Sequence, residues 1–169
     1  SDPDVRAKAS QATAELQRGH AGYRALWRHF VNLSIAEVKS DIAPFDVRFD
    51  QWLGESDAQP QIPLLIDQMK REGRAEESDG ALIVPIVDSA GAPMVPVMLL
   101  KSDGGATYHT SDLATIQMRI KEGAESVLYV VDARQEMHFR QVFAAAQQTS
   151  MAPDGLHLEH IKFGTINGE

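Results

Sequence analysis

The sequence contains no cysteine, few aromatic residues and fewer basic than acidic side chains. The absence of cysteine excludes disulfide bonds and cysteine-ligated zinc sites. With 16 basic and 24 acidic side chains the formal net charge is -8, so the surface is a poor match for a polyanion. If a nucleic acid is a partner, the main basic surface that binds it is not supplied by this chain. No apolar run is long enough to span a bilayer and no signal peptide opens the sequence, so we expect a cytoplasmic protein with no membrane partner.

The first part of the chain favours helices. Its 169 residues suffice for one domain with a substantial core. A helix is expected to begin at Asp2-Pro3-Asp4 and to end at Gly19, and a second runs from about residue 22 to residue 43. Residues 47–49 alternate like a short strand. Residues 62–72 have helical spacing, with Ile62, Leu65, Ile66 and Met69 on the inner face and Gly73 at the helix end. We expect the apolar stripe of the second helix to pack in a core; its members are Tyr23, Leu26, Trp27, Phe30, Ile35, Val38 and Ile42.

The middle of the chain predicts an antiparallel hairpin. Two apolar runs, residues 81–87 and 94–99, flank a turn at residues 88–93. Pro85 and Pro96 each remove one backbone donor, so part of this hairpin must lie at a sheet edge or a bulge. The preceding residues, 74–80, are polar and predicted to form a turn.

The last part of the chain has the alternation of an α/β protein. Gly104 and Gly105 allow a turn into a second short strand, after which Thr110 is the expected N-cap of a helix that ends at Gly123. Residues 127–131 are apolar throughout, as in a buried parallel strand. A helical pattern over residues 136–148 follows, and residues 156–161 then lead into a further strand. The pattern predicts a mainly parallel sheet with flanking helices.

Three polar side chains are candidates for binding a ligand: Gln135 lies beyond the carboxyl end of a strand, where ligands bind in such folds, and Tyr108 and Asp112 lie at a junction between a strand and a helix. Asp112 can accept the fork of N–H donors of a guanidinium, Tyr108 can pack against that flat group, and Gln135 can accept one further N–H. A structural alternative stands beside this interpretation. An aspartate in a first helical turn often serves only the helix dipole, and a tyrosine near a strand end is often half-buried. The residue types and spacing alone favour that alternative.

Other chemistries find no support in the sequence. The six histidines show no metal-binding spacing, so we predict no metal site. No glycine-rich stretch matches a phosphate-binding or dinucleotide-binding motif, and no Ser-His-Asp or Cys-His unit is framed by a nucleophile motif.

Several motifs occur in the order found in one known family. Residues 101–105 read KSDGG and residues 108–114 read YHTSDLA; residues 130–135 read VVDARQ and are followed by HF at 138–139. Residues 159–160 read EH and residues 163–164 read FG, while residues 47–50, 52–56 and 77–81 fit as well. With these motifs in this order, the chain resembles, over essentially its whole length, the arginyl-tRNA synthetases, a family of class I aminoacyl-tRNA synthetases.

The resemblance implies an α/β fold, namely a Rossmann-like catalytic-domain fragment with a mainly parallel sheet and an inserted antiparallel β-hairpin. Residues 1–72 would form the helical and first α/β part, residues 73–107 the inserted hairpin region, and residues 108–169 the second Rossmann half with the arginine side-chain site. The family activates arginine with ATP and Mg²⁺ to arginyl-adenylate and transfers the arginyl group to tRNA(Arg). No tightly bound cofactor is implied.

By position, the resemblance makes Tyr108, Asp112 and Gln135 the residues that bind the arginine side chain. The adenine of ATP would be bordered by three further residues, which are His160, Phe163 and Gly164.

The chain also departs from the family pattern. Counterparts of the HIGH-type and KMSKS-type motifs and of the tRNA-binding domains are missing, so we expect no catalytic residue within the chain and no activity from it alone. Both ends look abrupt, so we expect an internal piece whose exposed surface would allow copies to self-associate. The alternative is a non-catalytic, synthetase-like module that binds arginine or another cationic ligand.

Overall fold

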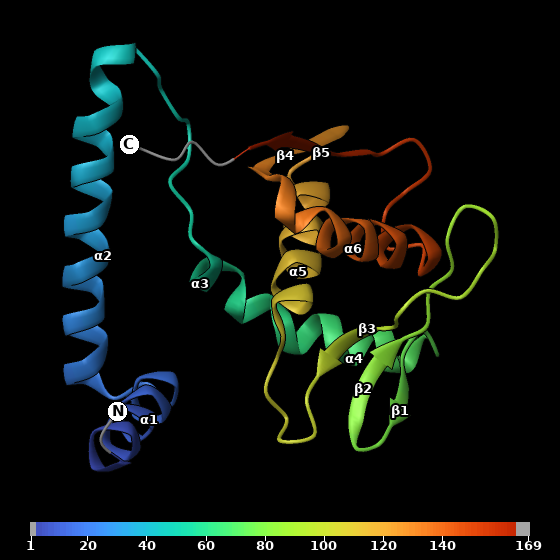
Figure 1. Cartoon of the computed structure of the whole chain (residues 1–169), viewed down its shortest axis with the longest axis horizontal. Coiled ribbons are helices and arrows are strands. Elements are labelled where there is room, and N and C mark those ends of the chain that lie inside the picture. The colour runs from blue at the N-terminus through green and yellow to red at the C-terminus, as the bar shows by residue number, and fades with distance from the viewer. Residues whose placement is uncertain (1–2, 165–169) are drawn as a thin grey trace. The chain divides into compact units, whose positions relative to one another are not determined.

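The computed structural model describes residues 3–164. The chain divides into two compact units, residues 1–52 and residues 53–169. Figure 1 shows the order of helices and strands along the chain. None of the helices in the described part is long and apolar enough to cross a membrane.

The first unit consists of the two predicted helices, α1 (Pro3–Gln17) and α2 (Ala21–Ile42), followed by a 3-10 turn, η1 (Ala43–Phe45). Gly19 has a φ of +93°, which suits glycine, and the side chain of His20 caps α2 by accepting the N–H of Tyr23. The short strand predicted at residues 47–49 is wrong. A strand needs a neighbour for its backbone groups, and no strand within residues 3–164 pairs with this segment.

The predicted core role of the α2 stripe is also wrong for this unit by itself. No residue of α2 is buried, and Leu26 and Phe30 are 50% and 57% exposed. Tyr23, Trp27 and Val38 are exposed too, whereas Ile35 and Ile42 are partly buried. The reason is that the unit offers α2 only one other long helix, α1, and one helix cannot cover the whole stripe.

The second unit contains an antiparallel sheet of β1 (Glu76–Ser78), β2 (Ala81–Val84) and β3 (Val97–Leu100), in that order. Strands β2 and β3 form the predicted hairpin, with a register shift between Leu82 and Ile83. Strand β2 ends just before Pro85 and β3 begins just after Pro96, because neither proline can donate to a ladder. The turn predicted over residues 74–80 is wrong for β1, which pairs with β2 as an antiparallel strand.

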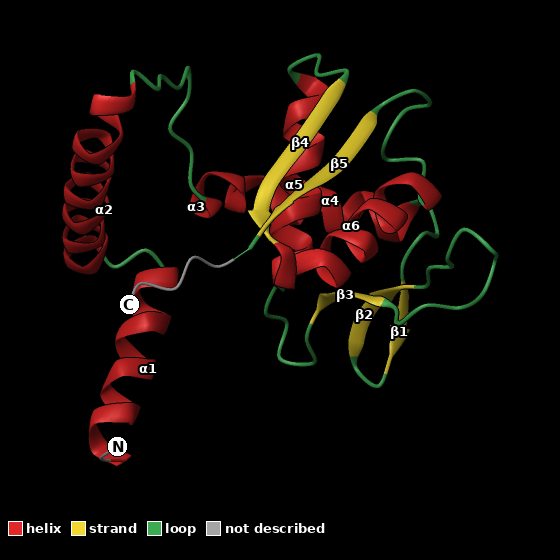
Figure 2. Cartoon of the chain, turned by 45° about the horizontal axis from the view of Figure 1, so that its top comes forward, coloured by secondary structure: helices red, strands yellow, loops and turns green. Residues whose placement is uncertain are grey.

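The second sheet is the predicted parallel pair, β4 (Ser126–Asp132) and β5 (His157–Phe163), with α6 (Glu136–Gln148) between them in sequence. Figure 2 shows the two strands side by side over helices α5 (Tyr108–Lys121) and α6. Full burial of β4 was predicted and is wrong, since Leu128 and Val130 are 51% and 65% exposed. Helices cover one face of this sheet and leave the alternate side chains of β4 exposed.

The core of the second unit surrounds α5. Helix α4 (Ile62–Arg71) packs against it, preceded by α3 (Glu55–Ala58) and a 3-10 turn, η2 (Gln59–Gln61). Helix α5 also contacts β3, α3 and α6, so its position is fixed from several sides. The predicted inner face of α4 is confirmed. The largest fully buried apolar side chains are Leu65, Val84, Val97, Leu99, Leu113, Ile116 and Val142.

Candidate functional site

Helix α5 begins at Tyr108, and its N-cap is Thr107 rather than the predicted Thr110. The hydroxyl of Thr107 donates to the carbonyl of Met98, and the buried hydroxyl of Thr110 donates to that of Leu99. Two threonines thus tie the start of α5 to the end of β3. Their Oγ atoms serve the strand, which explains why the N-cap makes no side-chain capping bond.

Because the N-cap lies three residues earlier than predicted, Asp112 falls in the second turn of α5, and no acidic residue lies in the first turn. The helix dipole acts mainly within the first turn, so it gives little reason for an aspartate at this position. Tyr108 is 75% exposed and therefore no half-buried core residue. Both structural alternatives from the sequence are weakened by these positions.

A tight turn leads the chain from β3 into α5. Gly104 takes a φ of +81°, and the backbone N–H of Lys101 donates to the carbonyl of Gly105 at 2.9 Å. The side chain of Asp103 accepts the N–H of Gly105 at 2.8 Å. The second short strand expected after this turn amounts to one bridge between Leu100 and Ala106.

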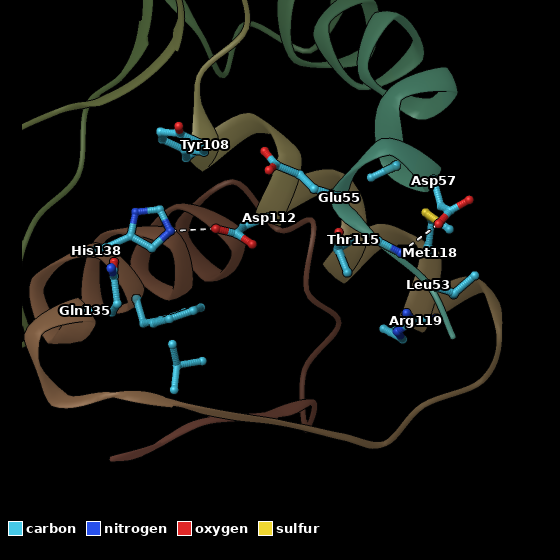
Figure 3. A pocket seen from close by; sticks show the side chains of 14 residues that line it. Leu53, Glu55, Asp57, Tyr108, Asp112, Thr115, Met118, Arg119, Gln135 and His138 are labelled. Carbon is cyan, nitrogen blue, oxygen red and sulfur yellow. Dashed lines mark hydrogen bonds and ion pairs between the residues drawn. The ribbon is translucent and has the colours of Figure 1, made fainter. Parts of the chain in front are cut away.

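Tyr108, Asp112 and Gln135 all line one cavity of about 470 Å³, which lies between α3, α5 and the start of α6 (Figure 3). Its volume is within the range of small-molecule sites. The structure therefore brings together the three side chains that the sequence singled out. The other lining residues are Leu53, Gly54, Glu55, Asp57, Ala58, Thr115, Met118, Arg119, Val131, His138 and Phe139.

Gln135 reaches the cavity through a local turn at the end of β4. The side chain of Asp132 accepts the backbone N–H of Arg134 at 2.8 Å and pairs with its guanidinium at 2.9 and 3.0 Å. This arrangement closes the 3-10 turn η3 (Ala133–Gln135), whose last residue precedes α6. Gln135 lies, as predicted, just beyond the carboxyl end of a parallel strand.

The carboxylate of Asp112 is held by a histidine. Its Oδ2 lies 2.5 Å from Nε2 of His138, and the two side chains are only 29% and 19% exposed. A carboxylate can only accept hydrogen bonds, so Nε2 of His138 is the donor. Both side chains line the cavity, and Figure 3 shows them facing each other, with Tyr108 and Gln135 nearby.

The cavity is lined by more acidic than basic groups. Glu55, Asp57 and Asp112 line it, against one cation, Arg119. Arg119 is paired with Glu122 at 2.7 Å, and Asp57 accepts the N–H of Gly54 at 2.7 Å. The balance of charge favours a cationic ligand. Within residues 3–164, no group of three or more histidine, aspartate or glutamate side chains could hold a metal ion.

Sequence reasoning missed two residues of the cavity, Glu55 and His138. The structure makes Glu55 the first residue of α3. Both positions lie in segments that carried the family resemblance, residues 52–56 and 138–139. Their place in these segments is the signal from which both residues could have been predicted.

The residues expected at the adenine are not among the lining of this cavity. Phe163 pairs with Asp132 in the parallel register and is 51% exposed. It therefore lies at the carboxyl end of the sheet, the same end at which β4 leads into the turn that carries Gln135. Gly164 follows it, with no atom within 4 Å of the position of an added Cβ.

His160 lies beside Tyr129 in the parallel sheet, and both rings pack on Phe139, at centroid distances of 4.9 and 4.7 Å. Nε2 of His160 lies 3.0 Å from the carbonyl of Val131 and donates to it. The other ring nitrogen and the hydroxyl of Tyr129 are buried without a hydrogen-bond partner in the described part of the chain. Burial, and then the charge of Asp112, raise the pKa of Tyr129 well above its usual value, so its hydroxyl stays protonated.

Comparison with known proteins identifies the class. The family described as "tRNA synthetases class I (R), catalytic domain" matches residues 1–169. The chain belongs to this family, and its fold is the predicted Rossmann-like α/β fold of a class I synthetase catalytic domain, with a parallel sheet and an antiparallel hairpin sheet.

Individual relatives agree. The chain is 45% identical over 171 residues to an arginine–tRNA ligase of Agathobacter rectalis, a match that covers all of this chain and 29% of that protein. It is 50% identical over 159 residues to an arginine–tRNA ligase of Maricaulis maris, covering 93% of this chain and 27% of the relative. The crystal structure of arginyl-tRNA synthetase from Plasmodium falciparum shares the fold with a TM-score of 0.82 at 23% identity, over 95% of this chain and 28% of that one. The chain thus spans less than a third of the length of these proteins.

Proposed function

We propose that this chain supplies the arginine side-chain pocket of a longer arginine–tRNA ligase. The single observation that carries the proposal is that Tyr108, Asp112 and Gln135 line one acidic cavity. The whole-chain similarity to arginine–tRNA ligases supports it. That ligase activates arginine with ATP to arginyl-adenylate and transfers the arginyl group to tRNA(Arg).

Each side chain has a task in this proposal. The carboxylate of Asp112 accepts two N–H groups of the guanidinium, a geometry that an ammonium cannot match. The exposed ring of Tyr108 packs on the flat group, and the amide oxygen of Gln135 accepts a further N–H. Glu55 adds negative charge to the same cavity. Arginine is thereby favoured over lysine.

ATP, with its Mg²⁺, is a substrate of the longer protein in this proposal. We place its adenine against His160, Phe163 and Gly164, since an exposed ring and an open glycine lie at the carboxyl end of β5. The chain carries no HIGH-type or KMSKS-type motif to handle the phosphates, so we predict that it forms no adenylate alone. Self-association of the isolated chain and a cytoplasmic location stay predictions from the sequence.

The test is the substitution Asp112→Asn in the full-length ligase, read by arginine-dependent exchange between ATP and pyrophosphate. Losing one charged acceptor removes about 1.5–3 kcal/mol of the free energy that stabilises the transition state, so kcat/KM for arginine falls roughly 10- to 150-fold. Asp154→Asn, in the exposed turn after α6, is the matched control and leaves the kinetics unchanged. Unchanged arginine kinetics in Asp112→Asn would remove this residue from the site.

The missing phosphate-binding motifs favour a second candidate, a non-catalytic module that binds a cationic amino acid. The gene that encodes this chain distinguishes the two. Flanking HIGH-like and KMSKS-like sequences support the ligase, and a stop codon directly after Glu169 supports the module.

A further inference from the structure

Two histidine–carboxylate pairs of the second unit differ in their surroundings. His157 and Glu159 pair at 2.9 Å on β5 with side chains 59% and 52% exposed. The pair of His138 and Asp112 joins two different helices, α6 and α5, with side chains 19% and 29% exposed. Only this second pair lines the acidic cavity.

The ring of His138 is itself held in place. It packs against His109 at a centroid distance of 4.6 Å and edge-on against Phe139 at 5.1 Å. Nε2 of His109 lies 3.4 Å from the amide oxygen of Gln141, and the amide nitrogen of Gln141 donates to the carbonyl of Val95 at 2.9 Å. A chain of contacts therefore runs from the segment before β3, through the two histidines, to Asp112.

A carboxylate that must accept a guanidinium fork has to be oriented as well as charged. The side chain of Asp112 has two free torsions, and its position in the second turn of α5 fixes neither of them. The bond from His138 occupies one lone pair of Oδ2. It leaves Oδ1 and the second lone pair of Oδ2 available to two N–H groups.

We propose that His138 is a positioning residue for arginine: its Nε2–H holds the carboxylate of Asp112 in the orientation that accepts the guanidinium. This inference rests on the proposed function of the cavity. His138 acts through Asp112, so it serves the binding of arginine more than the chemical step.

The experiment replaces His138 in the full-length ligase and measures KM for arginine, KM for ATP and kcat by pyrophosphate exchange. His138→Phe keeps a ring but has no donor, so the arginine KM rises about 3- to 10-fold while kcat and the ATP KM change less than twofold. His138→Gln carries an N–H at the reach of Nε2 and restores the arginine KM to within about twofold of wild type. His138→Asn, whose amide is too short to reach Oδ2, behaves like the phenylalanine variant.

The exposed pair supplies the matched controls, since His157→Phe and His157→Gln leave all three constants unchanged. Melting temperatures identify any variant that fails to fold. If His138→Phe does not fold, the arginine KM of His138→Gln compared with that of His138→Asn tests the proposal. The proposal is overturned if no His138 variant changes the arginine KM, or if glutamine and asparagine are equally impaired.

Asp112→Asn, measured alongside, separates the two claims. An unchanged arginine KM in that variant contradicts the proposed function. A raised KM there, together with unchanged constants in the His138 variants, contradicts only the role of His138.

Discussion

Two adjacent leucines of α4 provide a sharp test of how the core around α5 is built. Leu65 is completely buried, whereas Leu64, one residue earlier on the same helix, is 59% exposed. Helix α4 packs on α5, and Gln68 accepts a hydrogen bond from Gln117 at 2.9 Å across this contact. The support of the helix that carries Asp112 thus depends on the buried face of α4.

The expected cost follows from the burial. Leu65→Ala removes three buried carbon atoms, worth roughly 2.4 kcal/mol at about 0.8 kcal/mol each. The cavity left behind brings the total loss of unfolding free energy to about 3–4 kcal/mol. Leu64→Ala removes the same atoms from a mostly exposed position and changes that free energy by about 0.5 kcal/mol or less.

Thermal unfolding of the 169-residue chain, followed by far-ultraviolet circular dichroism, measures both variants. The cooperative transition belongs to the second unit, because no residue of α2 is buried in the first. Each kcal/mol shifts the midpoint by roughly 4–8 °C, so Leu65→Ala lowers it by more than about 12 °C and Leu64→Ala by only a few degrees. Equal shifts in the two variants would refute the assigned inner face of α4.

Three further predictions concern the site. Tyr108→Phe keeps the ring and removes an exposed hydroxyl, so we expect the arginine KM of the full-length ligase to rise only about 2- to 10-fold, with an unchanged melting temperature. Phe163→Ala is expected to raise the ATP KM in the same exchange assay and to leave the arginine KM as it is; the reverse pattern contradicts the placement of the adenine. Burial, and then the neighbouring His138, lower the pKa of His109 below its usual 6.5, so the unfolded chain takes up this proton first as the pH falls. Stability to urea therefore decreases below pH 6.5 by an amount that His109→Asn reduces, and an identical pH dependence in the variant would exclude this cause.

The sequence predicted those elements whose signals are local. Helix α6 begins and ends where its pattern indicated, and Gly73 follows α4 with a φ of +65°, as expected for a helix end. The apolar face of α4 was predicted correctly because its spacing matches the helical period and its neighbours cover it. Strands β2 and β3 were predicted because two apolar runs flank a turn, and the structure bounds both strands at the prolines within those runs.

Features that depend on distant partners were missed. Strand β1 is polar, and only its pairing with β2 makes it a strand. The stripe of α2 and the outer face of β4 have core-like sequences, but burial depends on what packs against them, which periodicity does not encode. The same holds for the site: residue types suggested Asp112, whereas its bond to His138, 26 residues later, requires two helices to meet.

The N-cap shows how a local rule can be overridden. Thr110 was the predicted N-cap, and Thr107 is a residue of the same type. In the structure both hydroxyls donate to carbonyls at the end of β3, so the contact with the strand decides where the helix begins.

A crystal structure of the full-length ligase with L-arginine bound tests the central claim most directly. The account predicts the guanidinium in the cavity between α3 and α5, with two of its N–H groups on the carboxylate of Asp112, the ring of Tyr108 against its face and the amide oxygen of Gln135 within hydrogen-bond distance. A guanidinium bound elsewhere, with these three side chains free of ligand, would contradict it.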